Sequence, residues 1–193
     1  MAFPDKGWEI KNGALTVMKN PEKEEQTGGD IVADEKYSAF DLSFEFKTTP
    51  VANSGVKYFV TLSNGTTGSA LGLEYQVLDD DRHPDAKLGR NGDRKLGSLY
   101  DLIPANKQPR FVRPVGAWSM ARIVVYPDNH VEHYLNGVKI LEYDRGSAAF
   151  KEAVALSKFK NDKDFGEGKD GYLLIQDHGC QVSYRNIKIK RLN

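Results

Sequence analysis

Alternation of apolar and polar residues with a period of two is the feature that most restricts how this chain can fold. Residues 40–47 read Phe-Asp-Leu-Ser-Phe-Glu-Phe-Lys, with the apolar side chains all in one phase. Successive side chains of a β-strand point to opposite faces, so this pattern predicts a strand with one buried face. Similar short segments recur between Gly, Asn, Asp and Pro residues: 8–10, 14–18, 55–62, 73–77, 121–125, 131–135, 138–143, 172–176 and 182–189.

Turn signals separate these segments, and helical signals are scarce. Asn12-Gly13 and Asn136-Gly137 each lie between two predicted strands, and both residue types tolerate the positive φ of a type I′ turn, so each pair predicts a hairpin. The best candidate helix is the alanine-rich segment 147–156. About ten short strands predict an all-β fold, a two-sheet antiparallel β-sandwich of the jelly-roll type. We expect its core to contain Phe44, Phe46, Tyr58, Val77, Ile123 and Ile175.

Chain length, net charge and cysteine content restrict the domain organisation and the classes of partner. The 193 residues predict a single domain, 1–193, that is large enough to need no metal or disulfide for its stability. Twenty-seven basic residues balance 27 acidic ones, which argues against nucleic acid or an anionic membrane as a partner held by charge. No apolar run reaches the length of a transmembrane helix. The single cysteine, Cys180, excludes an internal disulfide, and we expect it to be buried and inert.

Polar residues in phase on the outer faces of predicted strands are the candidate site. Glu74 and Gln76 lie opposite the apolar phase of their strand, and Lys57 is expected on an outer face with Phe59. Asn53 is in phase with Lys57, and Gln176 and His178 are two residues apart. Such residues either form a solvated sheet face or line a site. We expect Glu74, Gln76, Lys57 and His178 to share one concave face because they share a phase opposite apolar faces. The segment 79–116 is long for a plain connection, and long loops in compact domains are usually functional or disordered.

Histidine is the side chain best suited to proton transfer near neutral pH, and His178 is the strongest candidate for a general acid or base. His133 is in phase with apolar neighbours and is expected to pack in the core. His130 follows a turn and is expected to be exposed, and His83 lies in a charged segment that is expected to be solvated.

The carboxylate pattern fits an ordinary glycosidase poorly. Such an enzyme needs two carboxyl groups on either side of the scissile bond, but Gln76 stands where the second acid would follow Glu74. Asp79 is a possible partner only if the strand end curls back. Two acidic segments also suggest a divalent metal: Asp79–Asp81 with Asp85, and, more loosely, residues 162–167.

A series of short phrases, in order along nearly the whole chain, resembles one known family. The phrases are 29–32, 37–42, 52–56, 73–79, 98–102, 132–139, 176–179 and 185–190. They resemble the 3-keto-disaccharide hydrolase domain family, in which Glu74-Tyr75-Gln76 and Gln176-Asp177-His178-Gly179 match family motifs and Lys57 matches a subgroup. The resemblance implies a concanavalin A-like jelly roll, a bacterial protein exported to the periplasm or beyond the cell, and a carbohydrate substrate whose C3 carries a ketone.

A C3 ketone acidifies the C2 proton, so a single base can start the cleavage by β-elimination, and water then adds to the product. His178 or Glu74 is expected to be the base, and Lys57 or a divalent metal to stabilise the enolate. Substrate-binding roles are expected for Gln76, Asn53, Gln176, Asp79 and Tyr100, of which Tyr100 would form a stacking wall or supply an acid.

Two other functions stay open at this point. The first is a sugar-binding module without catalysis, which would use aromatic side chains: Phe59, Tyr75, Tyr100 and Trp118. The second is an ordinary hydrolase with two carboxylates, which requires Asp79 or another acid near Glu74. A binding module has no need of His178, Glu74 and Lys57 together, so a titratable cluster would favour an enzyme.

Overall fold

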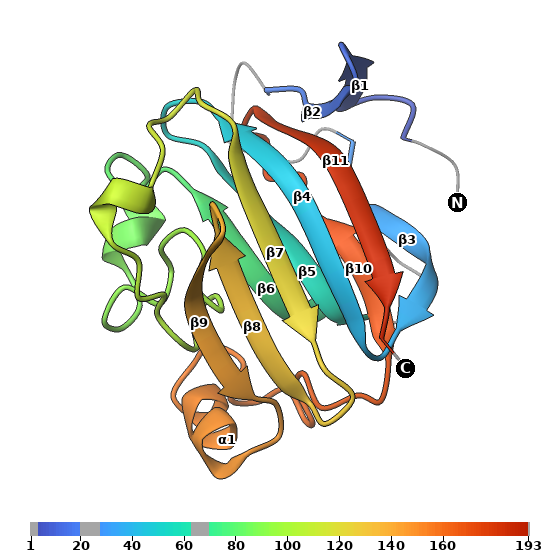
Figure 1. The fold of residues 1–193 in the computed structure, drawn as a ribbon, viewed down its shortest axis with the longest axis vertical. Helices are drawn as coiled ribbons and strands as arrows, with labels where there is room; N and C mark the ends of the chain where they lie inside the picture. Colours follow the sequence, from blue (N-terminus) through green and yellow to red (C-terminus); the bar gives the residue numbers. More distant parts are fainter. Residues whose placement is uncertain (1–3, 20–27, 63–69, 193) are drawn as a thin grey trace.

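The computed structural model describes residues 4–19, 28–62 and 70–192, which form two antiparallel β-sheets packed face to face (Figure 1). The larger sheet has the order β1-β2-β11-β4-β7-β8-β9. Its strands are, in that order, Trp8–Lys11, Ala14–Val17, Val182–Arg191, Phe40–Thr48, Ser119–Val125, His130–Leu135 and Val138–Asp144. The smaller sheet has the order β3-β10-β5-β6, with strands Ile31–Tyr37, Gly171–Ile175, Asn53–Thr61 and Leu71–Leu78.

The predicted sandwich is confirmed, and so are both predicted hairpins. β1 pairs with β2 and β8 with β9 around Asn-Gly turns in which all four residues have positive φ. The predicted helix is α1 (Ala148–Ala155), and the Ser147 hydroxyl caps its first turn by accepting from the Phe150 amide. Strand β3 is missing from the sequence prediction because its residues, Ile-Val-Ala-Asp-Glu-Lys-Tyr, do not alternate.

The core lies between the sheets and consists mainly of aromatic and branched side chains. Five of the six residues expected there are buried: Phe44, Phe46, Tyr58, Val77 and Ile123. Ile175 is partly buried and packs against the core. The expectation that Phe59 shares an outer face with Lys57 is wrong. Phe59 has a φ of 51°, at a point where the β5–β6 register shifts, and this bulge turns its ring into the core.

Strand register decides which side chains meet on the outer face of the smaller sheet. β5 and β6 pair so that Lys57 is opposite Glu74 and Gly55 is opposite Gln76. β10 lies on the other side of β5, and the Gln176 amide donates to the Gly55 carbonyl just beyond the end of that strand. The polar phases of three strands are therefore aligned across the sheet.

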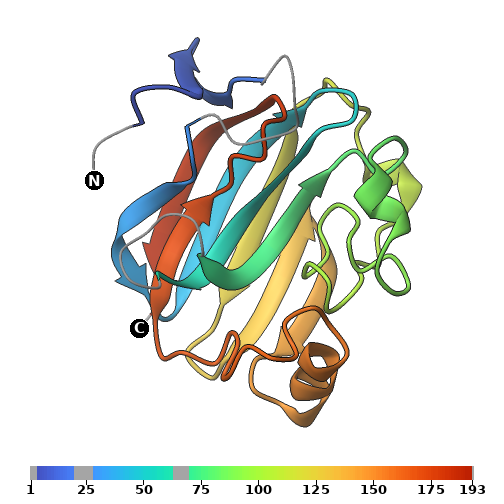
Figure 2. The same ribbon diagram turned by 180° about the vertical axis from the view of Figure 1, so that it is seen from behind.

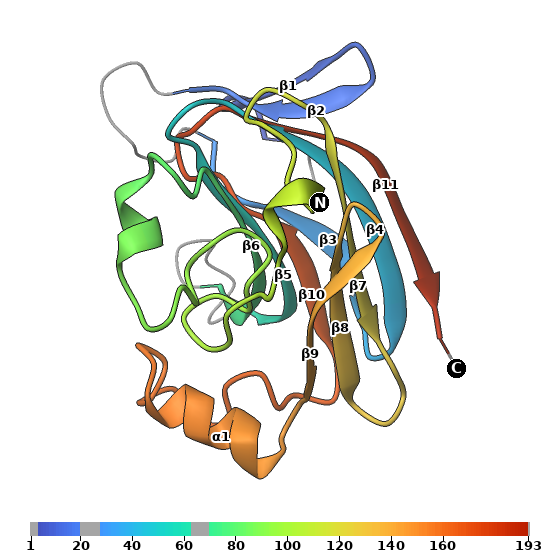
Figure 3. The ribbon, with the colours of Figure 1, turned by 60° about the vertical axis from the view of Figure 1, so that its left-hand side comes forward.

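The long segment between β6 and β7 covers the free edge of β6. Backbone hydrogen bonds join Gly97 to Gln76, Gln76 to Ser98 and Tyr100 to Glu74, as in an added strand. Short 3₁₀ turns at Pro84–Lys87 and Pro109–Phe111 belong to the same segment, which lies beside the smaller sheet in Figure 2. Figure 3 shows this segment on the side of the smaller sheet, whereas no described segment of comparable length covers the outer face of the larger sheet.

In the ranges that the structure describes, no helix is both long and apolar enough to cross a membrane.

Candidate active site

A cavity of about 250 Å³ opens on the outer face of the smaller sheet. Its lining consists of Asn53, Lys57, Ala70, Leu71, Gly72, Glu74, Gln76, Tyr100, Lys158, Phe159, Gln176 and His178. Seven of the eight predicted site residues are therefore together, and Asp79 is the exception. Their convergence follows from strand phase and register, whereas the role of each residue stays a prediction.

Glu74 occupies the floor of the cavity. Its side chain lies over Gly55 on the neighbouring strand, at a point where a Cβ atom on residue 55 would collide with the Glu74 carboxylate. Only 7% of Glu74 is exposed. The absence of a side chain at residue 55 thus allows a carboxylate to lie flat on the sheet, beneath the space available to a ligand.

Burial and opposing charges set the protonation of Glu74. Burial raises the pKa of its carboxyl group above the ordinary value, and the nearby Lys57 and Lys158 ammonium groups oppose that rise. The carboxylates of Asp30 and Asp85 add to it. The net effect is a raised pKa. This shift brings the pKa of the carboxyl group closer to neutral pH, where a group exchanges protons more easily.

Two buried polar atoms of the cavity residues have no hydrogen-bond partner among the residues that the structure describes: Gln76 Oε1 and His178 Nδ1. The Gln76 amide nitrogen donates to the Arg94 carbonyl at 3.4 Å, which leaves the oxygen as an acceptor. Buried polar groups normally have partners, and exceptions often mark a place where a ligand binds. A ligand carrying hydroxyl groups would satisfy both atoms.

The turn that carries His178 is held by two aspartates that sequence reasoning did not select. Asp177 is fully buried and accepts hydrogen bonds from the amides of Gly28, Gly29 and Gly179. The Asp177 amide in turn donates to Asp30 Oδ1 at 2.9 Å. This interlocked pair fixes the end of β10, and with it the position of His178.

Asp30 also acts electrostatically on the cavity. Burial raises the pKa of its carboxyl group, while the Asp177 amide and the Lys57 charge oppose this, and His178 also interacts with it. The resemblance phrase 29–32 contains Asp30, which is the one sequence signal that pointed to it.

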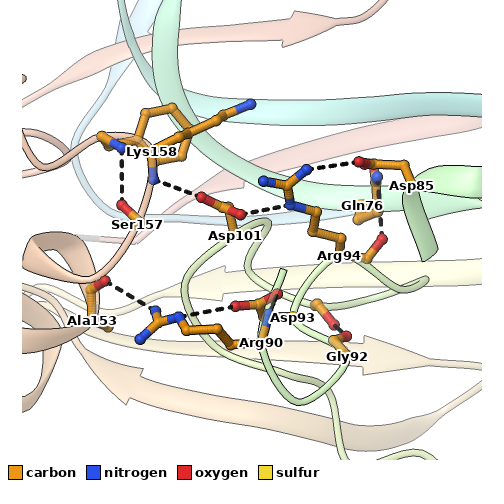
Figure 4. Close-up of polar contacts among 12 residues, drawn as sticks. Gln76, Asp85, Arg90, Gly92, Asp93, Arg94, Asp101, Ala153, Ser157 and Lys158 are labelled. Atoms are coloured by element: carbon orange, nitrogen blue, oxygen red, sulfur yellow. Dashed lines mark hydrogen bonds and ion pairs between the residues drawn. The ribbon is translucent and has the colours of Figure 1, made fainter. Parts of the chain in front are cut away.

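The wall opposite the floor comes from two loops that are far apart in the sequence. Lys158 follows α1, and its backbone amide donates to Asp101 Oδ2 at 2.7 Å. Its ammonium nitrogen lies 4.2 Å from the centroid of the Tyr100 ring, and Figure 4 shows its backbone contact with Asp101. Phe159 completes this wall. Neither Lys158 nor Phe159 carries a sequence signal, because the segment after the helix has no periodic pattern.

An arginine holds the Tyr100 loop in place. Arg94 Nη1 donates to Asp85 at 2.8 Å, and its Nε donates to Asp101 at 2.6 Å. The guanidinium also lies over the Tyr100 ring, 5.5 Å from its centroid. Burial raises the pKa of Tyr100 above its ordinary value, and the Asp85 charge raises it further. The phenol therefore stays protonated and is a weak acid.

Asp79 is a structural residue and does not line the cavity. Its carboxylate is buried and accepts from the Val51 amide at 2.9 Å and from Arg82 at 3.2 Å. These bonds tie the end of β6 to the turn before β5. The expected role of Asp79 in substrate binding is thus not supported by its position, and the same holds for its use as a second carboxylate beside Glu74.

The other groups of the 79–85 segment also bind protein partners. Asp80 accepts from the Leu96 amide at 2.7 Å and pairs with Lys107 at 2.8 Å. The expectation of a solvated His83 is wrong: it is buried, and its Nδ1 accepts from the Asp85 amide. Three of the carboxylates expected as metal ligands here, those of Asp79, Asp80 and Asp85, thus bind amide, ammonium or guanidinium groups of the protein.

One group of metal-ligating side chains with suitable spacing occurs among the described residues. It consists of His130, Glu132 and Glu142, on the larger sheet and away from the cavity. Lys139 Nζ already lies 3.0 Å from Glu132 and 2.5 Å from Glu142, so an ammonium group occupies the position of a cation.

Comparison with known proteins places the chain in a family. The family model for the 3-keto-alpha-glucoside-1,2-lyase-like domain matches residues 2–190. The chain belongs to this family. A curated relative from Bacteroides thetaiotaomicron VPI-5482, named 3-keto-disaccharide hydrolase, is 35% identical over 207 aligned positions, which cover 96% of this chain and 70% of the relative.

Solved structures agree with the fold. A protein of Parabacteroides distasonis ATCC 8503, described as a candidate glycosyl hydrolase, superposes with a TM-score of 0.81 at 30% identity, over 97% of this chain and 84% of that one. A Bacillus subtilis protein with a galectin-like fold has a TM-score of 0.55 at 12% identity, covering 96% and 86% of the two chains. The second likeness concerns the sandwich architecture alone.

Proposed function

We propose that this protein cleaves 3-keto-glycosides by removing the C2 proton, eliminating the C1 substituent and adding water to the resulting enone. Membership of the lyase-like family, and the name of the curated relative, support an enzyme that acts on carbohydrates. The elimination chemistry and the oxidised substrate are the proposal.

The observation that supports this proposal most is the number of carboxylates that line the cavity. Among the described residues that line the cavity, Glu74 is the one carboxylate, and the amide Gln76 stands next to it in phase. Direct displacement at C1 requires two carboxyl groups flanking the bond. Elimination next to a ketone requires a base, an enolate stabiliser and an acid instead, and the cavity supplies titratable groups of those kinds.

His178 is the proposed base. Its Nδ1 is buried and has no partner in the described part of the chain, so in a neutral ring that carries its proton on Nε2 the lone pair of Nδ1 can accept the C2 proton. The Asp30–Asp177 pair would hold the ring in position through the backbone of the turn. The nearby Asp30 carboxylate would stabilise the imidazolium that forms.

Lys57 is the proposed enolate stabiliser. It lies on the sheet floor opposite Glu74, and an ammonium group there would offset the negative charge that develops on the C3 oxygen. Gln76, Asn53 and Gln176 would orient the sugar hydroxyl groups, and Tyr100 would form the wall beside the ring. A divalent metal in place of Lys57 is the alternative electrophile.

The decisive experiment is a product assay on matched substrates. A 3-keto-glucoside should release its aglycone, whereas the unoxidised parent should be inert because its C2 proton is not acidic. Deuterium at C2 should slow the reaction when proton transfer limits the rate. Equal turnover of both substrates would contradict the proposal and favour the two-carboxylate hydrolase. Binding of sugar with no turnover of either substrate would indicate a sugar-binding module.

The same assay with a chelator distinguishes Lys57 from a divalent metal as the group that stabilises the enolate. Undiminished activity after exhaustive chelation, together with loss of activity in Lys57→Ala, would assign the enolate to the lysine. Loss of activity on chelation, restored by one divalent metal, would assign it to the ion instead.

A further inference from the structure

A second cavity lies beside the first. It has a volume of about 530 Å³, shares Leu71 with the first and is lined mainly by the segment 162–168. Phe159 of the first cavity stacks on Phe165 of the second, with ring centroids 4.0 Å apart. The first cavity falls below the usual range of about 300–1,000 Å³ for ligand pockets, so a glycoside of two units must extend beyond it.

The two lysines of the first cavity belong to different parts of it, the floor and the wall. Lys57 belongs to the floor, where β5 pairs with β6, and its ammonium lies 3.5 Å from the Ala70 carbonyl. Lys158 belongs to the wall, between Tyr100 and Phe159, and is exposed. It precedes Phe159 on the same loop that leads into the second cavity. A sugar ring bound to the floor would have Lys57 below it, and a substituent that extends toward the second cavity would pass Lys158.

We propose that Lys158 is the acid that protonates the departing glycosidic oxygen, and that Arg94 and Asp101 are the residues that position it. This inference rests on the proposed elimination. It assigns the leaving-group side of the site to the wall formed by Tyr100, Lys158 and Phe159, and the space for the leaving unit to the second cavity.

The step balances without a further reactant. The base takes the C2 proton, and the electron pair of the C2–H bond becomes the C1–C2 double bond through the enolate. The C1–O bond breaks, and the oxygen receives its electrons together with a proton from the Lys158 ammonium. Lys158 is left as a neutral amine, the base is left protonated, and exchange with water restores both.

Although much of the Lys158 side chain is exposed, the surrounding protein removes part of the hydration of its ammonium group. This desolvation lowers the pKa of Lys158 below the ordinary lysine value, while the Glu74 and Asp101 charges oppose that shift. A less basic ammonium group gives up its proton more readily. Tyr100 lies on the same wall, but its raised pKa makes it the weaker acid.

The positioning network explains how an exposed lysine is held in place. Asp101 accepts from the Lys158 backbone amide with one oxygen and from Arg94 Nε with the other. Arg94 is fixed in turn by Asp85. Figure 4 shows this chain of contacts running from Asp85 through Arg94 and Asp101 to Lys158. Side-chain freedom is then reduced by the Tyr100 ring, above which the ammonium lies.

Leaving-group dependence tests the proposal. Two substrates are compared: a p-nitrophenyl 3-keto-glucoside, whose oxyanion departs without a proton, and a methyl 3-keto-glucoside, whose oxyanion requires one. Lys158→Met should lower kcat on the methyl substrate by about 10²-fold and on the aryl substrate by less than about threefold. Arg94→Lys, which loses the paired contacts, should lower the methyl rate more than the aryl rate.

Two further variants separate acid catalysis from charge and from general damage. Lys158→Arg keeps the positive charge but gives up no proton near neutral pH, so it should not restore turnover of the methyl substrate. Lys160→Met removes an exposed lysine two residues away and should change neither rate.

Five outcomes overturn the inference. Equal loss on both substrates, or no loss in Lys158→Met, would show that Lys158 is not the acid. Restored turnover in Lys158→Arg would make it a charge stabiliser only. A leaving-group-dependent loss in Tyr100→Phe but not in Lys158→Met would transfer the role to the phenol. An unaltered enzyme that cleaves neither substrate would refute the proposed function itself.

Discussion

The two sheets present outer faces that are built on the same alternating pattern, yet the faces differ in what their polar groups do. On the larger sheet, Asp41 and Arg122 form two hydrogen bonds of 2.7 Å each, and Glu45 binds Arg185 and Asn186. These polar groups are paired with one another and face solvent. The outer face of the smaller sheet has Glu74 and Gln76 in equivalent positions, but both are buried.

The difference comes from the loops and not from the strands. The segments 97–103 and 157–159 cover part of the smaller sheet and remove water from its polar side chains. Gln76 Oε1 and His178 Nδ1 nevertheless have no partner among the described residues. On the larger sheet, Trp118 lies between Lys47 and Arg185 with its ring against their charged groups. A polar sheet face becomes a site when it is covered and left partly unpaired, and it stays a solvated surface when its charges satisfy one another.

The sharpest test of this contrast uses substitutions on the two faces. His178→Ala should lower the rate on a 3-keto-glucoside by about 10²–10⁴-fold, and Glu74→Gln should also reduce it. Glu45→Gln makes the same chemical change on the larger sheet and should leave the rate within about twofold. Rates come from aglycone release, with folding checked by circular dichroism. A comparable loss in Glu45→Gln would contradict the functional difference between the faces.

The buried layer between the faces predicts a pH effect on stability. His133 is fully buried, and burial lowers its pKa to about 4. Its Nδ1 donates to the Gly97 carbonyl, so the neutral ring accepts from the Tyr58 hydroxyl at Nε2. The folded state therefore binds this proton less readily than the unfolded chain, whose histidine has a pKa of about 6.5.

The depressed pKa of His133 contributes up to about 3 kcal/mol to the free energy of unfolding. This contribution is fully present above about pH 6.5 and is lost as the pH falls toward 4. Urea unfolding at pH 7.5 and 4.5 measures it. His133→Gln should lose less stability on acidification than the unaltered protein, whereas His130→Gln should keep its full acid sensitivity. An identical pH dependence in His133→Gln would contradict the assignment.

The floor of the site can be disturbed by a substitution that replaces no titratable residue. Gly55→Ala would place a methyl group against the Glu74 carboxylate, and because that side chain is flexible at its end, the carboxylate should move and the fold should survive. We expect a loss of about 10²-fold in turnover, since displacement of a site group by about 1 Å has such effects. A melting curve and a rate assay together check this, and an unchanged rate would show that the position of Glu74 is not critical.

The smallest effect is expected from the paired charges of the larger sheet. Asp41→Asn removes one partner of Arg122 on a partly exposed surface, where such pairs contribute about 0.2–1 kcal/mol. Chemical unfolding should therefore show a small loss that diminishes at high salt. A loss above about 2 kcal/mol would mean that this face contributes more to the fold than its exposure suggests.

Strand phase allowed most of the site floor to be predicted. Asn53, Lys57, Glu74, Gln76, Gln176 and His178 were selected because they oppose apolar phases, and all six line the cavity. Where the alternation of apolar and polar residues is interrupted, the prediction of strands and of their faces failed. The bulge at Phe59 reverses its face, and the non-alternating β3 gave no signal. The acidic segment 79–85 suggested ligands because charge composition does not show which carboxylates will meet an amide or a guanidinium.

By itself, the sequence determined the sandwich, its hairpins and the polar face of β5 and β6, because alternation and turn chemistry act over neighbouring residues. The tertiary structure alone decided that Lys158 meets Tyr100 and that Asp79 turns away to bind Val51 and Arg82. It also decided that Asp30 binds the Asp177 amide, next to His178 in the chain. These arrangements join segments that are distant in the chain or depend on which partner a charge finds. No local pattern encodes such a choice, since it is settled by the packing of loops onto a sheet that has already formed.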